Sequence, residues 1–248
     1  MKKIKDLVNE NFIWANILYH VGYKFYEILE YDIEEICEKI NMNFSQLSKK
    51  LVEISNRLTP PKKIAEYNLE VLVEYLRSSH HWFIKHQFPY ISDLIIALNN
   101  QQEDNKNDSN NLIRDLQMLF PLLREDFIHH IHEEEDTLFQ HILLLNEAQK
   151  NPLKLSTIYK KIEKKSIQFY ALEHNTHDDE MKGIRELTKN YQIPSNTSLL
   201  MKVIILELQE LETDLKAHAK IEDEILFVKA LQAEKKIKSK VTESEKWN

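Results

Sequence analysis

Glycine is scarce in this chain. There are only two glycines in 248 residues, Gly22 and Gly183, whereas an average composition of about 7% would give roughly 17. Type I′ and II′ hairpins, dinucleotide-binding loops and phosphate-binding loops all need residues that readily take a positive φ. The shortage therefore argues against a β-rich fold, a Rossmann unit and a P-loop, and it favours helices joined by turns without glycine.

Disulfides, long apolar runs and excess positive charge are missing as well. Cys37 is the only cysteine, which rules out an intrachain disulfide and suits a reducing compartment. No run approaches the ~20 apolar residues of a membrane span, and the first residues lack a secretory signal pattern. The net charge is −7, from 33 basic and 40 acidic side chains, which gives no electrostatic footprint for nucleic acid. We therefore expect a cytoplasmic protein with no membrane and no nucleic-acid partner.

Proline and helical periodicity divide the chain. Residues 1–58 read as short helices, with capping boxes predicted at Asp32/Glu35 and at Asn43/Gln46. The consecutive Pro60 and Pro61 stop a helix and predict a linker. After the linker, four long helical stretches with short connections are predicted, at 68–100, 112–149, 153–190 and 197–233. The first should kink at Pro89.

These patterns predict an all-α protein in which a small N-terminal helical domain precedes an antiparallel four-helix bundle. The predicted parts are an N-terminal domain at 1–58, a linker at 59–66, a bundle at 67–233 and a charged tail at 234–248. We expect the tail to be frayed, because it is rich in charge.

A ten-residue pattern occurs twice. HIHEEEDTLF starts at His130 and HAKIEDEILF starts at His218, and both follow H-x3-E-[ED]-x2-L-F. Residues four apart share a helix face, so His130 pairs with Glu134 and His218 pairs with Glu222. One such pair is usually an ordinary surface contact. Two pairs on apolar stripes are costly unless they are paired or bound to metal, and they predict a dinuclear site of iron, manganese or zinc between helices.

The other two long helices should complete this metal site. On the third, His174 lies on an apolar stripe, and His177 and Asp178 share its face as further candidates. On the first, His80 and His81 compete. Periodicity favours His80, because His81 points about 100° away on the same helix.

Three further motifs accompany the repeat: H-H-x7-P from His80 to Pro89, E-H at His174, and D-L-x2-H-x3-E-x3-L-F ending at Phe227. With these motifs the chain resembles, over nearly its whole length, the iron–sulfur cluster repair di-iron proteins. This family, also called Repair of Iron Centers or ScdA-type, is hemerythrin-like. The resemblance implies a four-helix bundle that binds two irons through histidines and two bridging glutamates.

The ligands that the resemblance implies are His81, His130, Glu134, His174, His218 and Glu222. In the first motif the ligand of the family is the second histidine, so the resemblance points to His81 where periodicity favours His80.

The chain departs from the family at several positions. A further histidine ligand of the family corresponds to Gln102, and the neighbouring Glu103 is a candidate substitute. A Cys-Cys pair of the N-terminal domain is replaced by Tyr26-Glu27, so thiol chemistry is not expected there. Asp178 stands where the family tends to have glycine.

The resemblance implies a cytoplasmic di-iron protein that helps to repair iron–sulfur clusters after nitrosative or oxidative damage. Whether it is an enzyme stays open, and a non-enzymatic metal-binding role is favoured. Its partners would be damaged iron–sulfur proteins, with NO or O2 as small ligands, and a homodimer is left open. One alternative is a hemerythrin-like protein that binds or senses O2 or NO. A second is a structural helical protein with a degenerate metal site.

Overall fold

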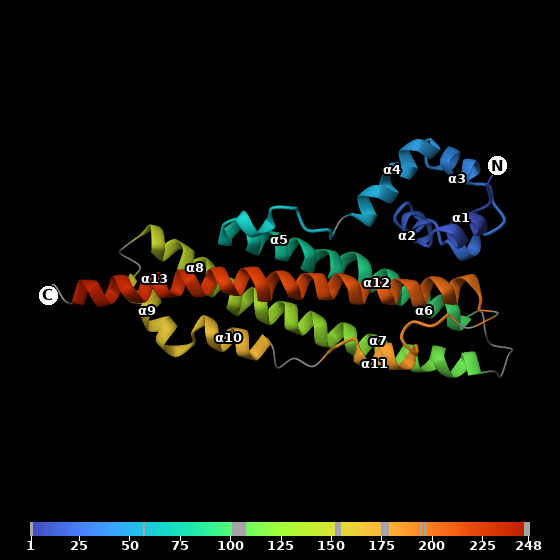
Figure 1. Ribbon diagram of the computed structural model, residues 1–248. Helices are drawn as coiled ribbons and strands as arrows, with labels where there is room; N and C mark the ends of the chain where they lie inside the picture. Colours follow the sequence, from blue (N-terminus) through green and yellow to red (C-terminus); the bar gives the residue numbers. More distant parts are fainter. Residues whose placement is uncertain are drawn as a thin grey trace. The chain divides into compact units, whose positions relative to one another are not determined.

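The computed structural model is helical nearly throughout (Figure 1). It describes residues 2–56, 58–100, 108–151, 155–174, 179–193, 195 and 197–245. Among these residues there is no β-strand, only one isolated bridge between Lys3 and Asp32. The predicted all-α class is therefore confirmed.

The first part of the chain folds into short capped helices. They are α1 (Ile4–Glu10), α2 (Ile13–His20), the 3-10 turn η1 (Phe25–Glu27), α3 (Ile33–Lys39) and α4 (Phe44–Ser55). Both predicted capping boxes are confirmed. The Asp32 backbone N–H donates to the Glu35 carboxylate at 3.2 Å, and Asn43 and Gln46 exchange two hydrogen bonds of 2.8 Å. Cys37 is buried in the core of these helices.

Turns in this glycine-poor chain are made largely by other residues. Gly22 does take φ +89° after α2, but Asn41 takes +52° after α3. A run of three residues, Lys189 to Tyr191, has φ between 53° and 59°. A left-handed conformation costs a side-chain-bearing residue about 1–2 kcal/mol, so packing of the surrounding helices must hold this run in place.

Three long helical stretches each contain a π-helical segment of five residues. The first consists of α5 (Leu69–Trp82), η3 (Phe83–Gln87) and α6 (Phe88–Asn100), with the 3-10 turn η2 (Ile64–Glu66) before it. The second consists of α7 (Asp108–Glu133), η4 (Glu134–Leu138) and α8 (Phe139–Lys150). The third consists of α12 (Leu199–Ile221), η6 (Glu222–Leu226) and α13 (Phe227–Glu245).

The π-helical segments coincide with the sequence motifs. In the first stretch the segment ends just before the predicted kink site, Pro89. In the other two it begins at Glu134 and at Glu222, the glutamates of the repeat. Single π turns inside α-helices occur frequently at functional sites.

The predicted helix at 153–190 is broken into three. These helices are α9 (Leu155–Lys164), α10 (Ile167–His174) and α11 (Lys182–Leu187). Between α9 and α10, the Ser166 hydroxyl accepts a hydrogen bond from the Phe169 N–H at 3.3 Å, which caps a new helix start. The expectation of one continuous helix was wrong, because the apolar periodicity does not reveal this cap.

The charged tail also differs from expectation. It continues α13 as far as Glu245 instead of fraying from residue 234. Ile237 is fully buried and Glu234 is only 4% exposed. This mainly charged helical segment therefore also faces the core at two positions.

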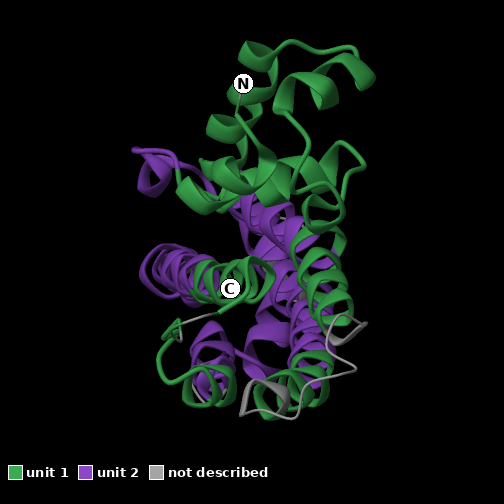
Figure 2. Ribbon diagram, turned by 90° about the vertical axis from the view of Figure 1, so that its right-hand side faces the viewer, with its two compact units in different colours: residues 1–60, 85–121, 183–212 green, residues 61–84, 122–182, 213–248 purple. Residues whose placement is uncertain are grey.

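The described chain divides into two compact units (Figure 2). The first comprises residues 1–60, 85–121 and 183–212, and the second comprises residues 61–84, 122–182 and 213–248. In the second unit, α13 packs against α8, α9 and α10, and α5 packs against α8. Leu76, Phe139, Ile142, Leu226 and Ala230 are fully buried in its core. This core supports the helix faces that carry the predicted ligands.

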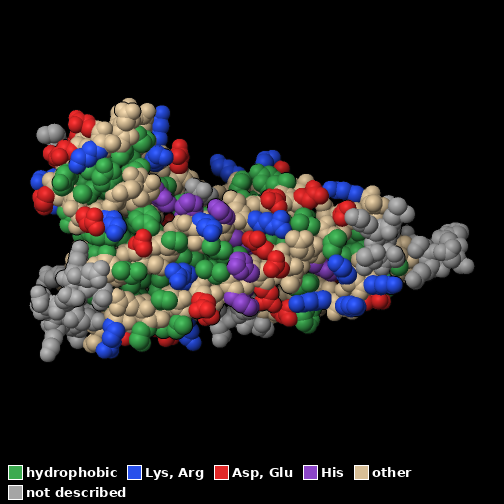
Figure 3. Space-filling model, turned by 180° about the vertical axis from the view of Figure 1, so that it is seen from behind, with side chains coloured by type: hydrophobic (Ala, Val, Ile, Leu, Met, Phe, Trp, Pro, Cys, Tyr) green, Lys and Arg blue, Asp and Glu red, His purple; other side chains and the backbone are tan. Residues whose placement is uncertain are grey.

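Side chains of both charges and histidines are interspersed on the molecular face in Figure 3. None of the described helices combines the length and the apolar character that crossing a membrane requires.

Candidate metal centre

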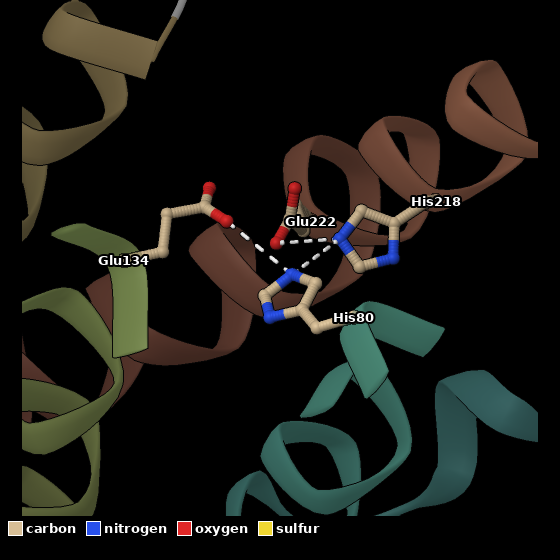
Figure 4. Close-up of side chains that lie close together, drawn as sticks. All are labelled: His80, Glu134, His218 and Glu222. Carbon is tan, nitrogen blue, oxygen red and sulfur yellow. Dashed lines mark hydrogen bonds and ion pairs between the residues drawn. The ribbon is translucent and has the colours of Figure 1, made fainter. Parts of the chain in front are cut away.

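Four buried side chains meet inside the second unit. They are His80 from α5, Glu134 at the start of η4, His218 from α12 and Glu222 at the start of η6 (Figure 4). One ligand atom from each lies within 4.8 Å of the others. The Nε2 atoms of His80 and His218 are 3.0 Å apart, and His218 Nε2 is 3.3 Å from a Glu222 oxygen. These side chains are positioned to hold one metal ion.

A second group lies beside the first. It consists of His130 from the last turn of α7, Glu134, and His174 at the end of α10. The Glu134 Oε1 atom is 3.2 Å from His130 Nε2 and 3.5 Å from His174 Nε2. The repeat thus brings its two H-x3-E pairs together, and His174 joins them as predicted by periodicity.

Both glutamates contact both groups. Glu134 turns Oε2 toward His80 at 3.4 Å and Oε1 toward His130. Glu222 turns Oε1 toward His218 and Oε2 toward His174 at 3.1 Å. Each carboxylate therefore offers one oxygen to each histidine pair, which is the arrangement a bridging ligand needs.

Burial and charge pull the histidine pKa values in opposite directions. Burial lowers the pKa of His80 and of His174, but hydrogen bonds to carboxylates outweigh it and raise both to about 9. The pKa of His130 is also raised by Glu134 against the effect of burial. Burial would raise the pKa of Glu222, but His218 and His174 hold it well below its usual value. In the cluster, the carboxylates therefore stabilise the protonated imidazoles, and the imidazoles stabilise the ionised carboxylates.

A second carboxylate follows each shared glutamate. Glu135 Oε1 accepts from His80 Nδ1 at 2.8 Å, and Asp223 Oδ1 is 3.2 Å from His174 Nδ1. Carboxylates that bind the outer nitrogen of an imidazole fix its tautomer and direct the inner nitrogen toward a metal. Sequence reasoning missed both residues, although the acidic position after each glutamate of the repeat is a signal for them.

The side chains at the centre fit metal ions better than they fit one another. Both oxygens of Glu134, one oxygen of Glu222 and Nδ1 of His218 are buried without a hydrogen-bond partner. Buried polar atoms in proteins are almost always partnered, so these oxygens call for a further binding partner at the centre. Imidazole nitrogens with carboxylate oxygens are a donor set for iron, manganese or zinc.

A cavity of about 250 Å³ reaches the centre from the side of His130 and His174. Its walls include Glu134, Tyr170 and Glu173. Small molecules could therefore reach one side of the centre, whereas His80 and His218 are more deeply buried.

The structure distinguishes between the two neighbouring histidines of α5. His80 is 1% exposed and points into the cluster, whereas His81, which the resemblance implied as the ligand, lies on the surface. Successive residues of an α-helix are rotated by about 100°, so only one of the two can face inward. The geometry therefore places His80, the residue that periodicity favoured, in the cluster, and His81 outside it.

Three further candidates, Glu103, His177 and Asp178, lie outside the described residues. A residue that sequence reasoning did not consider, Glu180, lies near the centre. Burial raises its pKa to about 7, with His130 opposing that rise. Its position after α10 carries no motif that would have indicated it.

Comparison with known proteins gives consistent matches. The sequence model of the "Hemerythrin HHE cation binding domain" matches residues 71–230. The chain is similar to the "Iron-sulfur cluster repair protein ScdA" of Staphylococcus epidermidis, with 24% identity over 203 residues, which cover 78% of this chain and 81% of the relative.

Two other relatives match over a larger share of the chain. One is a protein of the same name from Staphylococcus haemolyticus, with 20% identity over 228 residues, covering 91% of this chain and 96% of the relative. The other is a "Probable iron-sulfur cluster repair protein" of Haemophilus influenzae, with 21% identity over 214 residues, covering 82% and 88%.

Proposed function

Because the chain belongs to the hemerythrin family of cation-binding HHE domains, we propose that it is a di-iron protein that helps to repair iron–sulfur clusters. Membership of this family confirms the resemblance that the motifs indicated. Together with the all-helical structure, it also confirms the predicted helical-bundle class. The number and kind of metal ions, the ligands and the clients are our proposal.

The arrangement of the two glutamates supports a dinuclear centre. We assign His80 and His218 to one iron and His130 and His174 to the other, with Glu134 and Glu222 shared between them. Carboxylates that span two histidine pairs are a recurrent way of holding two metals in a helix bundle. Bound iron would supply redox chemistry and affinity for diatomic ligands.

The repair role is supported by the names of the relatives and by access to the centre. All three relatives are named for iron–sulfur cluster repair. On our assignment, two imidazoles and two carboxylate oxygens would hold each iron, and bound iron would supply affinity for NO or O2. The cavity beside His130 and His174 gives a small molecule access to that side. We propose a non-enzymatic protein that serves damaged iron–sulfur proteins in the cytoplasm.

The dinuclear assignment is tested by removing a shared carboxylate. In Glu134→Ala or Glu222→Ala, we expect the iron content after anaerobic reconstitution to fall from two ions per chain to one or none. Each substitution removes a ligand from both irons at once. Metal analysis and Mössbauer spectroscopy on the anaerobically prepared chain measure the content and the coupling of the irons.

Glu125→Ala is the matched control, because Glu125 is an exposed acid on α7, the helix that also carries His130. It should keep two irons. If Glu134→Ala or Glu222→Ala also kept two coupled irons per chain, the shared role would be wrong. If the wild-type chain contained no metal after purification from iron-supplied cells, this result would instead support the alternative of a structural helical protein with a degenerate metal site.

The cavity at His130 and His174 also favours a second candidate function, the reversible binding of O2 or NO. Exposure of the reduced, iron-loaded chain to O2 separates the two functions. Loss of iron or irreversible oxidation agrees with repair, and transfer of iron to an apo iron–sulfur protein would support it directly. A stable absorption band that disappears on removal of O2 would favour carriage or sensing.

A further inference from the structure

The second unit contains another hollow, of about 300 Å³, next to the metal centre. It is lined by residues of η4, α8, α9 and α10, and by Lys165 between the last two helices. Thr137 and Tyr170 line both this hollow and the cavity that leads to the metal centre. None of the proposed iron ligands lines it, so it is a separate site.

Positive charge dominates the walls of this hollow. Three lysines, Lys161, Lys164 and Lys165, line it together with one acid, Asp136. Lys165 is bound to Glu173 at 2.7 Å and lies 4.3 Å from the centre of the Tyr170 ring. In the described part of the chain, neither Lys161 nor Lys164 forms an ion pair. Two ammonium groups are thus available to a ligand, in a protein whose net charge is −7.

A buried histidine lines the same hollow. His141 is 6% exposed, and its Nε2 atom is buried without a hydrogen-bond partner. A buried polar atom without a partner is costly, so a ligand that partners this ring would be stabilising. Burial, with Lys161 and Lys165, lowers the pKa of His141 against the opposing effect of Glu234 on α13. A neutral ring keeps one N–H donor and one acceptor nitrogen.

We propose that this hollow binds a small multivalent oxyanion, a molecule that carries carboxylate or phosphate groups. Lys161 and Lys164 bind its charged groups, and His141, Gln140 and Tyr170 offer polar contacts around it. The volume lies at the lower end of the range for small-molecule sites, so the ligand is larger than a single water and smaller than a dinucleotide. The grouping of the lysines around one hollow favours a small molecule over a nucleic-acid or membrane surface.

The test measures binding to the full-length chain by isothermal titration calorimetry in buffer without Mg²⁺. Tricarballylate is the carboxylate probe, on iron-loaded and on metal-free protein, and pyrophosphate is the phosphate probe, on metal-free protein. We expect saturable binding of one molecule per chain for at least one probe. Whichever probe binds more tightly identifies the carboxylate or the phosphate chemistry.

Substitutions then locate the binding. Lys161→Gln/Lys164→Gln should weaken the affinity at least about tenfold, because it removes the two ammonium groups of the hollow that form no ion pair. The control is Lys160→Gln, which removes a positive charge from an exposed neighbouring position of α9 that does not line the hollow. Its affinity should stay within about twofold of the wild-type value. Circular dichroism checks that each variant is folded, and both positions altered in the double variant are exposed.

The outcomes separate this site from the metal centre. Binding of tricarballylate to metal-free protein supports the proposal whether or not the iron assignment holds. Binding that requires iron would place the anion on the metals and overturn the proposal. Absence of saturable binding for both probes, or equal weakening by Lys160→Gln and the double variant, would overturn it as well.

Discussion

Glu135 and Asp223 support histidines that belong to other helices. Glu135 follows Glu134 but binds His80 of α5, and Asp223 follows Glu222 but binds His174 of α10. Each acid thus directly follows a shared glutamate in the chain and binds a histidine from a different helix. Such links orient imidazoles before a metal arrives, which reduces the cost of assembling the centre.

We expect Glu135→Gln and Asp223→Asn to weaken iron binding about 10- to 100-fold while still allowing two irons at saturation. The amides keep the shape of the side chain but lose the charge that supports the histidine. Competition with a chelator of known affinity measures the change. Glu224→Gln, an exposed neighbour on the same π-helical segment, is the control and should bind like the wild type.

His80→Ala and His81→Ala form a second test at the level of single residues. The first should lower the iron content, because it removes a buried ligand. The second should leave the content unchanged, because His81 is at the surface. Metal analysis of the two purified proteins compares them directly. Loss of iron in His81→Ala with retention in His80→Ala would restore the assignment that the resemblance implied.

Most residues of the cluster could be predicted from the sequence. The duplicated H-x3-E spacing predicted that Glu134 and Glu222 come together, and the apolar stripe of the third helix indicated His174. Glu135 and Asp223 were not predicted, because neighbouring positions of a regular α-helix point in different directions. Both residues also lie in π-helical segments, for which the sequence carries no clear signal.

At the level of elements, Glu234 fixes the start of the helix that carries His174. From α13, its carboxylate accepts the N–H of Ile167, the first residue of α10, at 2.7 Å, and both groups are buried. Helix starts leave backbone donors that need partners. This contact therefore positions α10 against α13.

Glu234→Ala should lower the free energy of unfolding by about 1–3 kcal/mol, because it leaves the N–H of Ile167 buried without an acceptor. Thermal and urea unfolding measure the effect. Lys238→Ala is the control: it removes only the partly exposed lysine that binds the other Glu234 oxygen at 2.6 Å. A loss in Lys238→Ala as large as in Glu234→Ala would mean that the ion pair, rather than the helix start, accounts for the effect.

The elements were predictable where the sequence carries caps or long apolar stripes. The starts of α3 and α4 followed from their capping boxes. The break between α9 and α10 did not, because a lone serine inside an amphipathic run also occurs in continuous helices. The helical tail depends on Glu234 and Ile237, whose burial requires the rest of the second unit.

At the level of the whole molecule, the raised histidine pKa values predict how stability depends on pH. His80 and His174 have pKa values of about 9 in the folded metal-free chain, against 6.5 for the unperturbed group. Their protonated forms stabilise the fold, so this contribution is complete below about pH 6.5 and is lost as the pH rises through 9.

The melting temperature of the metal-free chain should therefore fall between pH 6.5 and pH 9. His80→Ala should show a smaller fall, because it lacks one of the histidines whose pKa is raised in the folded chain. Differential scanning calorimetry across this range measures both proteins. Equal slopes for the two proteins would show that His80 does not contribute to the dependence.

The proposed ligands come from four separate stretches of the chain, and this separation has a consequence for the unfolded state. Two metal ions held by the two histidine pairs and by the shared Glu134 and Glu222 would tie together segments that lie far apart in the sequence. Such a tie closes long loops and reduces the conformational entropy of the unfolded chain, as a cross-link does. A protein with a single cysteine has no disulfide of its own for this purpose. Iron would therefore act as its removable cross-link, and iron starvation would loosen the second unit and open it to proteases.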